Sequence, residues 1–139
     1  MANEDPTKRL ILVVEDIQET RDGIEKLLQA DGYQIALARD EQDAIEIASR
    51  LAPELILVSL AGLPHEVILT ARRIRERAAL GEHVAVVVFC IEGLAQGAEE
   101  ALGQHVYVTR PDNFNQLRRL IARLLHKNPT STRIELLTV

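Results

Sequence analysis

Leu10–Asp16 has the sequence LILVVED, five apolar residues followed by two carboxylates. A short apolar run bounded by polar residues is typical of a strand buried on both faces, as in a parallel sheet that helices cover on either side. Glu15 and Asp16 then stand at the carboxyl end of that strand. The segment therefore predicts a central strand with an acidic pair at its tip.

The alternation of strand and helix continues along the chain. Four further apolar or weakly alternating runs predict strands: Tyr33–Ala38, Leu55–Leu60, Val84–Phe89 and Val106–Val108. Apolar residues at helical spacing predict helices over 17–28, 44–51, 66–80, 94–102 and 117–125, of which 94–102 is the weakest because it is rich in Ala and Gly. Strict alternation predicts a three-layer, doubly wound (βα)5 α/β fold with a five-stranded parallel sheet.

The length of 139 residues favours a single domain. We expect a flexible leader at residues 1–8, the domain at 9–126, and a linker with a short apolar tail at 127–139. The tail includes RIELLTV, which is either a frayed end or an extra strand or docking segment.

Charge and cysteine content narrow the class of protein. A net charge of −5 repels the phosphate backbone, so we expect no nucleic-acid partner. The single cysteine, Cys90, cannot form an internal disulfide. No apolar run has the length of a signal-peptide core or a membrane span. These features predict a cytoplasmic protein without a membrane partner.

Ligands of open parallel sheets bind beyond the carboxyl ends of the strands. In this sequence those ends carry Glu15 and Asp16, then Ser59, then Phe89 or Cys90, and finally Thr109–Pro111. We therefore expect these residues, although far apart in sequence, to gather in one cleft.

Five motifs in this order and at near-normal spacing resemble the receiver domain of two-component response regulators. They are ILVVED at 11–16, DGY at 31–33, PELILVSL at 53–60, VVVFC at 86–90 and VYVTRP at 106–111. The resemblance covers residues 9–125 and implies a flavodoxin-like, CheY-like fold in a bacterial phosphorelay. In that family an aspartate after the third strand accepts a phosphoryl group from a histidine kinase, and an acidic pair after the first strand holds Mg²⁺.

The resemblance places Glu15 and Asp16 at the acidic pair and Ser59 at the phosphoacceptor position. No aspartate lies between Glu54 and Pro64, so a shifted register does not supply one. A serine hydroxyl is a poor nucleophile near neutral pH without an adjacent base, and it brings no negative charge to a metal. We expect a degenerate receiver with weak or absent Mg²⁺ binding and no other cofactor.

Two phosphate-contact positions are also altered. Cys90 stands where the family has Thr or Ser, and Arg110 stands where it has Lys. Arg presents a planar fork and Lys a point charge, so the second change is not conservative at a phosphate site. Arg110 is expected to pair with Glu15 or Asp16, and the Arg110–Pro111 bond is a candidate for the cis form. Tyr107 matches the family's switch aromatic.

These departures favour a signalling protein that is not an enzyme. We expect a stand-alone receiver that acts as a phosphorylation-independent interaction module, binding a protein partner or a second copy of itself. The expected face combines the fourth helix, fifth strand and fifth helix, at 96–102, 106–108 and 117–125. The alternative is a switch that a serine kinase phosphorylates on Ser59.

Overall fold

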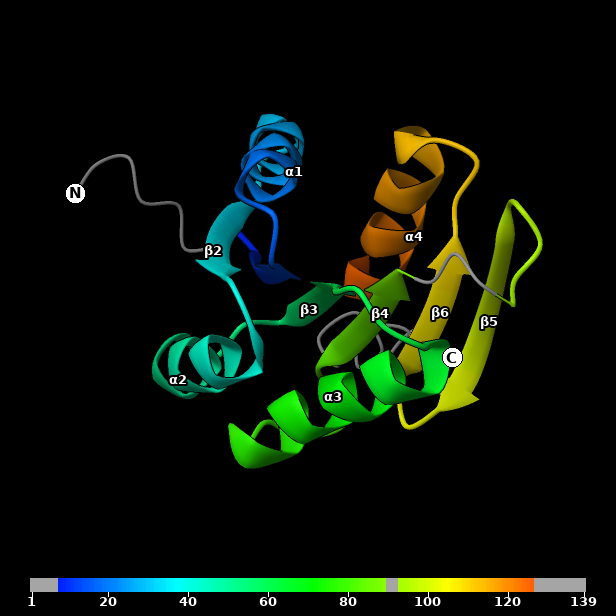
Figure 1. Cartoon of the computed structure of the whole chain (residues 1–139). Helices are drawn as coiled ribbons and strands as arrows, with labels where there is room; N and C mark the ends of the chain where they lie inside the picture. Colours follow the sequence, from blue (N-terminus) through cyan, green and yellow to red (C-terminus); the bar gives the residue numbers. More distant parts are fainter. Residues whose placement is uncertain (1–7, 90–92, 127–139) are drawn as a thin grey trace, which may run out of the picture.

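The computed structural model describes residues 8–89 and 93–126 of the chain (Figure 1). The predicted tail at 127–139 and most of the predicted leader lie outside these residues. Ten elements follow one another along the chain: β1 (Leu10–Glu15), α1 (Gln18–Ala30), β2 (Gln34–Ala38), α2 (Glu41–Leu51), β3 (Leu55–Ser59), α3 (Pro64–Arg77), β4 (Ala85–Phe89), β5 (Ala98–Gly103), β6 (Val106–Arg110) and α4 (Phe114–His126).

The strands form one twisted sheet in the order β2-β1-β3-β4-β6-β5. Every neighbouring pair in β2-β1-β3-β4-β6 is parallel, and β5 alone runs antiparallel to its neighbour β6. The predicted class, an α/β fold with a doubly wound, mostly parallel sheet, is confirmed. The sheet has six strands instead of the five predicted, and four helices are present among the described residues.

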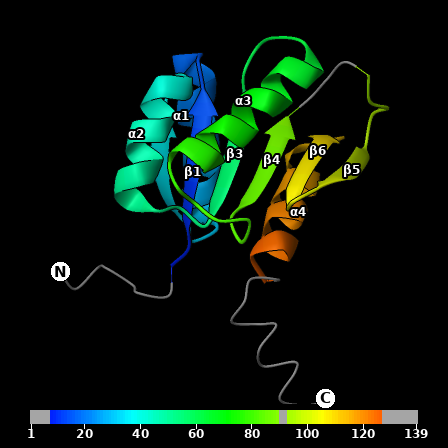
Figure 2. The same cartoon turned by 90° about the horizontal axis from the view of Figure 1, so that it is seen from below.

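Helices cover both faces of the sheet, with α1 and α4 on one side and α2 and α3 on the other (Figures 1 and 2). Alternate residues of β1 supply the two cores. Ile11 and Val13 pack with α1 and α4, whereas Leu12 and Val14 pack with α2 and α3. Both pairs are fully buried. This is why LILVV is apolar without interruption: each of its two faces meets a layer of helices.

The predicted helix at 94–102 is wrong: this part of the chain forms a turn followed by strand β5. Gly97 and Gly103 have φ values of 86° and 93°, which a helix interior does not accept. Gln104 and His105 then form a two-residue loop with φ values of 57° and 63°, as in the turn that favours a tight β-hairpin. The backbone groups of β5 pair with those of β6 in this hairpin, whereas a nine-residue helix with Gly97 in its interior would be marginally stable.

Capping residues fix where two helices begin. The side chain of Asp40 accepts a hydrogen bond from the backbone N–H of Asp43 at 2.9 Å and so starts α2. Asn113 Oδ1 accepts from the N–H of Gln116 at 3.0 Å and starts α4. Because Asn113 caps α4, this helix begins close to the carboxyl end of β6 and brings Phe114 to that edge of the sheet.

None of the described helices combines the length and the apolar character that crossing a bilayer requires.

Candidate functional site

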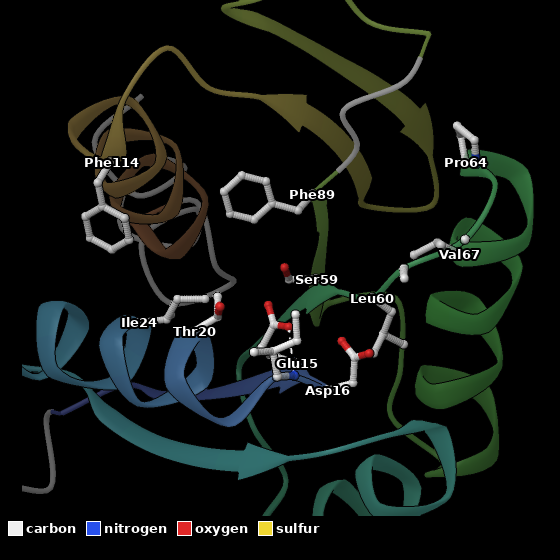
Figure 3. A pocket seen from close by; sticks show the side chains of 13 residues that line it. Glu15, Asp16, Thr20, Ile24, Ser59, Leu60, Pro64, Val67, Phe89 and Phe114 are labelled. Carbon is white, nitrogen blue, oxygen red and sulfur yellow. Dashed lines mark hydrogen bonds between the residues drawn. The ribbon is translucent and has the colours of Figure 1, made fainter.

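A cleft of about 540 Å³ opens at the carboxyl ends of β1, β3 and β4 (Figure 3). Figure 3 shows Glu15, Asp16 and Ser59 near its centre, with Thr20 and Ile24 of α1 on one side. Its remaining lining is apolar and comes from the ends of β3 and β4 and from the starts of α1, α3 and α4: Ile17, Leu60, Ala61, Gly62, Pro64, Val67, Phe89 and Phe114. The predicted gathering of strand-end residues thus holds for the acidic pair, the serine and Phe89.

Glu15 is the most constrained of the polar residues in the cleft. Glu15 is only 3% exposed, and its Oε2 accepts a hydrogen bond from the backbone N–H of Ile17 at 3.1 Å. The guanidinium of Arg21 donates to the backbone carbonyl of Glu15 at 2.8 Å, not to the carboxylate. Among the described residues, no Arg, Lys or His forms an ion pair with Glu15.

Ser59 lies beside Glu15 because β1 and β3 are parallel neighbours in which these two residues are register partners. Ser59 is half-buried at the last position of β3, and Asp16 is exposed one residue beyond β1. The position that the resemblance assigns to phosphate capture therefore presents a hydroxyl, with one buried and one exposed carboxylate close by.

The end of β4 contributes Phe89 to the cleft, whereas Cys90 lies outside the described residues. Phe89 is the register partner of Thr109 on β6. Thr109 is fully buried, and its hydroxyl donates to the backbone carbonyl of Ala98 at 3.2 Å. Thr109 therefore holds the β5–β6 hairpin together and does not line the cleft.

Arg110 does not meet the acidic pair. Its Nη1 donates to the backbone carbonyl of Leu94 at 3.0 Å, and it forms no ion pair with Glu15 or Asp16. The predicted pair is therefore wrong, because the turn before β5 offers the guanidinium a carbonyl partner nearer to β6. The expected cis bond is also wrong: no described peptide bond, Arg110–Pro111 included, is cis.

Tyr107 lies on β6, half-buried against the core that α1 and α4 share, and outside the cleft lining. Its ring meets the ring of His105 edge-on, with centroids 5.5 Å apart. The structure thus places the predicted switch aromatic on the β5–β6 hairpin, next to its turn.

The donor set for a metal ion is small. Mg²⁺ requires near-octahedral oxygen ligands and usually binds one or two protein carboxylates. The cleft offers the carboxylates of Glu15 and Asp16 and two hydroxyls, while its other walls are apolar. Within residues 8–89 and 93–126, no three His, Cys, Asp or Glu side chains come together as metal ligands would. Two of the cleft's polar residues, Glu15 and Asp16, could thus bind a metal through carboxylates, whereas Ser59 offers only a neutral hydroxyl.

The sequence did not indicate several residues that shape the cleft. Thr20 and Ile24 lie one helical turn apart on α1, and Val67 and Phe114 come from α3 and α4. Helical spacing identifies Ile24 and Val67 as inward-facing, but the same signal is given by any core residue. Only the way the helices pack against the sheet turns these positions toward the site.

The chain belongs to the response regulator receiver domain family, whose model matches residues 11–122. Receiver domains are signalling modules of two-component systems, so the class that the sequence motifs predict is confirmed. The match begins on β1 and ends within α4, and it therefore includes the whole cleft.

Individual relatives agree with this assignment. The chain is 26% identical over 129 residues to the Aerobic respiration control protein ArcA of Escherichia coli strain K12, with 87% of this chain and 52% of that protein covered. It therefore spans about half the length of the curated relatives it matches.

Solved structures show the same fold. The receiver domain of sensor histidine kinase PA1611 from Pseudomonas aeruginosa, which has a magnesium ion coordinated in its active-site cleft, is 26% identical, with a TM-score of 0.64 and with 87% of this chain and all of that chain covered. A chain in the complex of histidine kinase ThkA with response regulator protein TrrA is 18% identical, with a TM-score of 0.65 and coverage of 84% and 98%.

Proposed function

We propose that this receiver domain transmits a signal by binding a protein partner and that it does so without aspartyl phosphorylation. The observation that carries the proposal is the position of Ser59, which ends β3 in register with Glu15 where the family has its phosphoacceptor aspartate. A carboxylate attacks a phosphoryl group directly, whereas a hydroxyl must first lose its proton to a base. Transfer from a histidine donor thus lacks its acceptor.

The surroundings of Ser59 support the same conclusion. Mg²⁺, where bound in this family, neutralises charge on the phosphoryl group, and Glu15 and Asp16 are the residues of this chain that would hold it. Oε2 of Glu15 is already engaged by the N–H of Ile17, and Arg110 is engaged by the carbonyl of Leu94. We therefore expect weak or absent Mg²⁺ binding and no cation poised over the cleft for a phosphoryl group.

Strand β5 stands where the sequence predicts the fourth helix of the partner face. We therefore propose a partner face formed by β5, β6 and α4. β5 is the outer strand of the sheet (Figure 1). Its residues from Glu99 to Gly103 are all exposed. An edge strand presents unpaired N–H and C=O groups that can pair with another chain. We propose that a partner protein in the cytoplasm, or a second copy of this chain, binds here.

The test is incubation of the purified chain with acetyl phosphate and Mg²⁺, followed by intact-mass measurement. We expect no gain of a phosphoryl group. An acid-stable or acyl-linked phosphoryl adduct formed on the time scale of an ordinary receiver would overturn the proposal. A receiver domain that acetyl phosphate is known to phosphorylate, prepared in parallel, serves as the positive control.

Phosphorylation of Ser59 by a serine kinase is the alternative, because the hydroxyl faces an open cleft. It predicts a mass gain after incubation with ATP and cell extract that is absent from a Ser59→Ala variant. We expect neither wild type nor Ser59→Ala to gain the mass of a phosphoryl group, since Ser59 is half-buried at a strand end and not on an extended, accessible segment.

A further inference from the structure

The two edges of the described sheet differ in how far they are covered. β2 forms one edge, and its residues are half-buried or fully buried, with α1 and α2 in contact with it. β5 forms the other edge (Figures 1 and 2). Its residues Glu99–Gly103 are exposed. An exposed edge strand presents backbone N–H and C=O groups that can pair with a strand of another chain. The sheet can therefore be extended at β5 and not at β2.

The two faces of β5 differ in how their acidic side chains are bound. Glu99 points toward α4, where its carboxylate accepts hydrogen bonds from Arg123 at 2.8 Å and from Gln116 at 3.1 Å. Glu100 is the register partner of Val108, which packs in the core under α2 and α3, so Glu100 points to that opposite face. It is exposed and forms no ion pair within the part of the chain that the structure describes. Glu100 is therefore the acidic group that a second strand at this edge would meet.

A basic group lies at the other end of β5, on the side of the sheet that α3 covers. Arg72 of α3 donates to the backbone carbonyl of Leu102 at 3.5 Å and to the side chain of Gln104, just beyond β5. A guanidinium has five N–H donors, so Arg72 retains donors for a carboxylate. Leu102 and Leu69, which lies one helical turn before Arg72, are exposed apolar side chains. β5 thus has an acidic group in its first half and a basic group with two leucines at its end.

This order of charges is complementary to itself. When two copies of one strand pair in an antiparallel arrangement, a two-fold axis perpendicular to the sheet relates them, and the first half of each strand lies opposite the second half of the other. With the axis near Ala101, Glu100 of each copy lies opposite Leu102 of the other copy and within reach of its Arg72. The same contact then forms twice. This self-complementarity favours a second copy over an unlike chain, which would need both charges in the matching order.

We infer that two copies of this chain associate by antiparallel pairing of their β5 strands, with Glu100 of each copy bound to Arg72 of the other and with the exposed leucines packed around these contacts. The two sheets then form one continuous sheet. This inference rests on the proposed function, because it names the partner of the face proposed there. An interface built on one strand pair is small, so we expect the association to be reversible and to depend on concentration.

Sedimentation equilibrium of the full chain tests the inference. We expect a monomer–dimer equilibrium with a dissociation constant on the order of 100 µM, as suits a small interface. Glu100→Arg and Arg72→Glu should each weaken dimerisation about tenfold or more, because each places like charges opposite one another twice. An equimolar mixture of the two variants should recover the dimer, since the mixed pair contains an Arg–Glu contact at both positions.

The mixture separates loss of the interface from loss of folding, because one misfolded variant does not repair another. Glu46→Arg is the matched control: it makes the same charge change at an exposed position on α2, at the opposite edge of the sheet from β5 (Figure 1). It should leave the dissociation constant unchanged. Amide hydrogen exchange of wild type should show protection of residues 98–103 that increases with protein concentration, as pairing of the strands requires.

A wild-type chain that stays monomeric at about 1 mM would overturn the inference, and so would a mixture of the two folded variants that stays monomeric. Protection of β5 that does not change with concentration would assign the edge to residues 127–139 of the same chain and would also overturn it. A monomeric wild type with an unlike co-purifying protein that Glu100→Arg loses would assign the edge to that protein instead. These failures leave the proposed function standing, whereas phosphorylation by acetyl phosphate would overturn that function and leave the dimer.

Discussion

Glu15 and Ser59 are register partners on the parallel strands β1 and β3, so a buried carboxylate and a hydroxyl lie side by side at the carboxyl edge of the sheet. Arg110 donates to a backbone carbonyl and not to either carboxylate of the acidic pair, and apart from Asp16 and Thr20 the other residues that line the cleft are apolar or glycine. The receiver fold is retained, and we propose that the chemistry of its cleft has changed.

A carboxylate at position 59 should be enough for metal binding but not for phosphorylation at an ordinary rate. In Ser59→Asp a second carboxylate lies directly beside Glu15, and repulsion between like charges should lower the free energy of unfolding by about 1 kcal/mol without Mg²⁺. Added Mg²⁺ should then raise the melting temperature of this variant and not that of wild type. Ser59→Asn, which has the same shape without the charge, is the control, and differential scanning calorimetry is the measurement.

The same Ser59→Asp variant should not be phosphorylated at the rate of an ordinary receiver, because Arg110 remains bound to the carbonyl of Leu94. Intact-mass kinetics with acetyl phosphate would show this, and the double variant Ser59→Asp/Arg110→Lys should react faster than the single one. Rapid acyl-phosphate formation in Ser59→Asp alone would show that Arg110 is no obstacle.

Replacing Gly97 tests whether residues 94–102 form a turn and strand β5 of the hairpin, and not a helix. Gly97 has a φ of 86°, and a Cβ there would lie 3.4 Å from the carboxylate of Asp112. Gly97→Ala should therefore destabilise the protein by about 1 kcal/mol. In a helix the same change would stabilise it by a similar amount, about 1 kcal/mol.

Gly23→Ala is the matched control for this substitution. Gly23 lies within α1, and a Cβ there would meet nothing within 4 Å. It should stabilise the protein by about 0.5–1 kcal/mol. Urea titrations of wild type, Gly97→Ala and Gly23→Ala measure both effects. A stabilising effect of both substitutions would contradict the hairpin.

The sequence predicts most of this fold because the buried strands are uniformly apolar and end in polar residues. Leu10–Glu15 and Leu55–Ser59 are fixed by that pattern, and with them the neighbouring positions of Glu15 and Ser59. The β5 hairpin escaped prediction because its turn uses Gln104 and His105, which are not the usual Asn-Gly pair for two positive φ values.

Two further features could not be predicted from the sequence: the contacts of Arg110 and the apolar lining of the cleft. The reason differs from that for the hairpin. Arg110 is held by the carbonyl of Leu94, and Leu94 reaches that place only because the chain turns into β5. Phe114 enters the cleft only through the start of α4 that Asn113 caps. Both depend on tertiary packing, which a periodic pattern in one segment does not encode.

We expect the ion pair between Arg73 of α3 and Glu41 of α2 to make the stability of the protein depend on pH in the acid range. Arg73 donates two hydrogen bonds to Glu41, at 2.7 and 2.8 Å, and these hold the pKa of the Glu41 carboxyl below its ordinary value of 4.5. A lowered pKa means that this stabilisation is fully present above the unfolded-state pKa and is lost as pH falls through the folded-state pKa.

Glu41→Gln removes that titration. The difference in free energy of unfolding between wild type and Glu41→Gln should be largest near neutral pH and should shrink as the pH falls below about 4.5. Glu46→Gln on the same helix, exposed and without an ion pair among the described residues, should show no such trend. Urea titrations at a series of pH values measure both, and a constant difference for Glu41→Gln would refute the assignment.

The most direct measurement for the whole account is the amide NMR spectrum of the wild-type chain titrated with beryllofluoride in the presence of Mg²⁺. Beryllofluoride mimics a phosphoryl group on a carboxylate, and a hydroxyl at position 59 gives it nothing to bind. We predict that the amide signals of Glu15, Ser59 and Leu60 do not move. Saturable shifts of these signals would contradict the claim that this receiver works without phosphorylation.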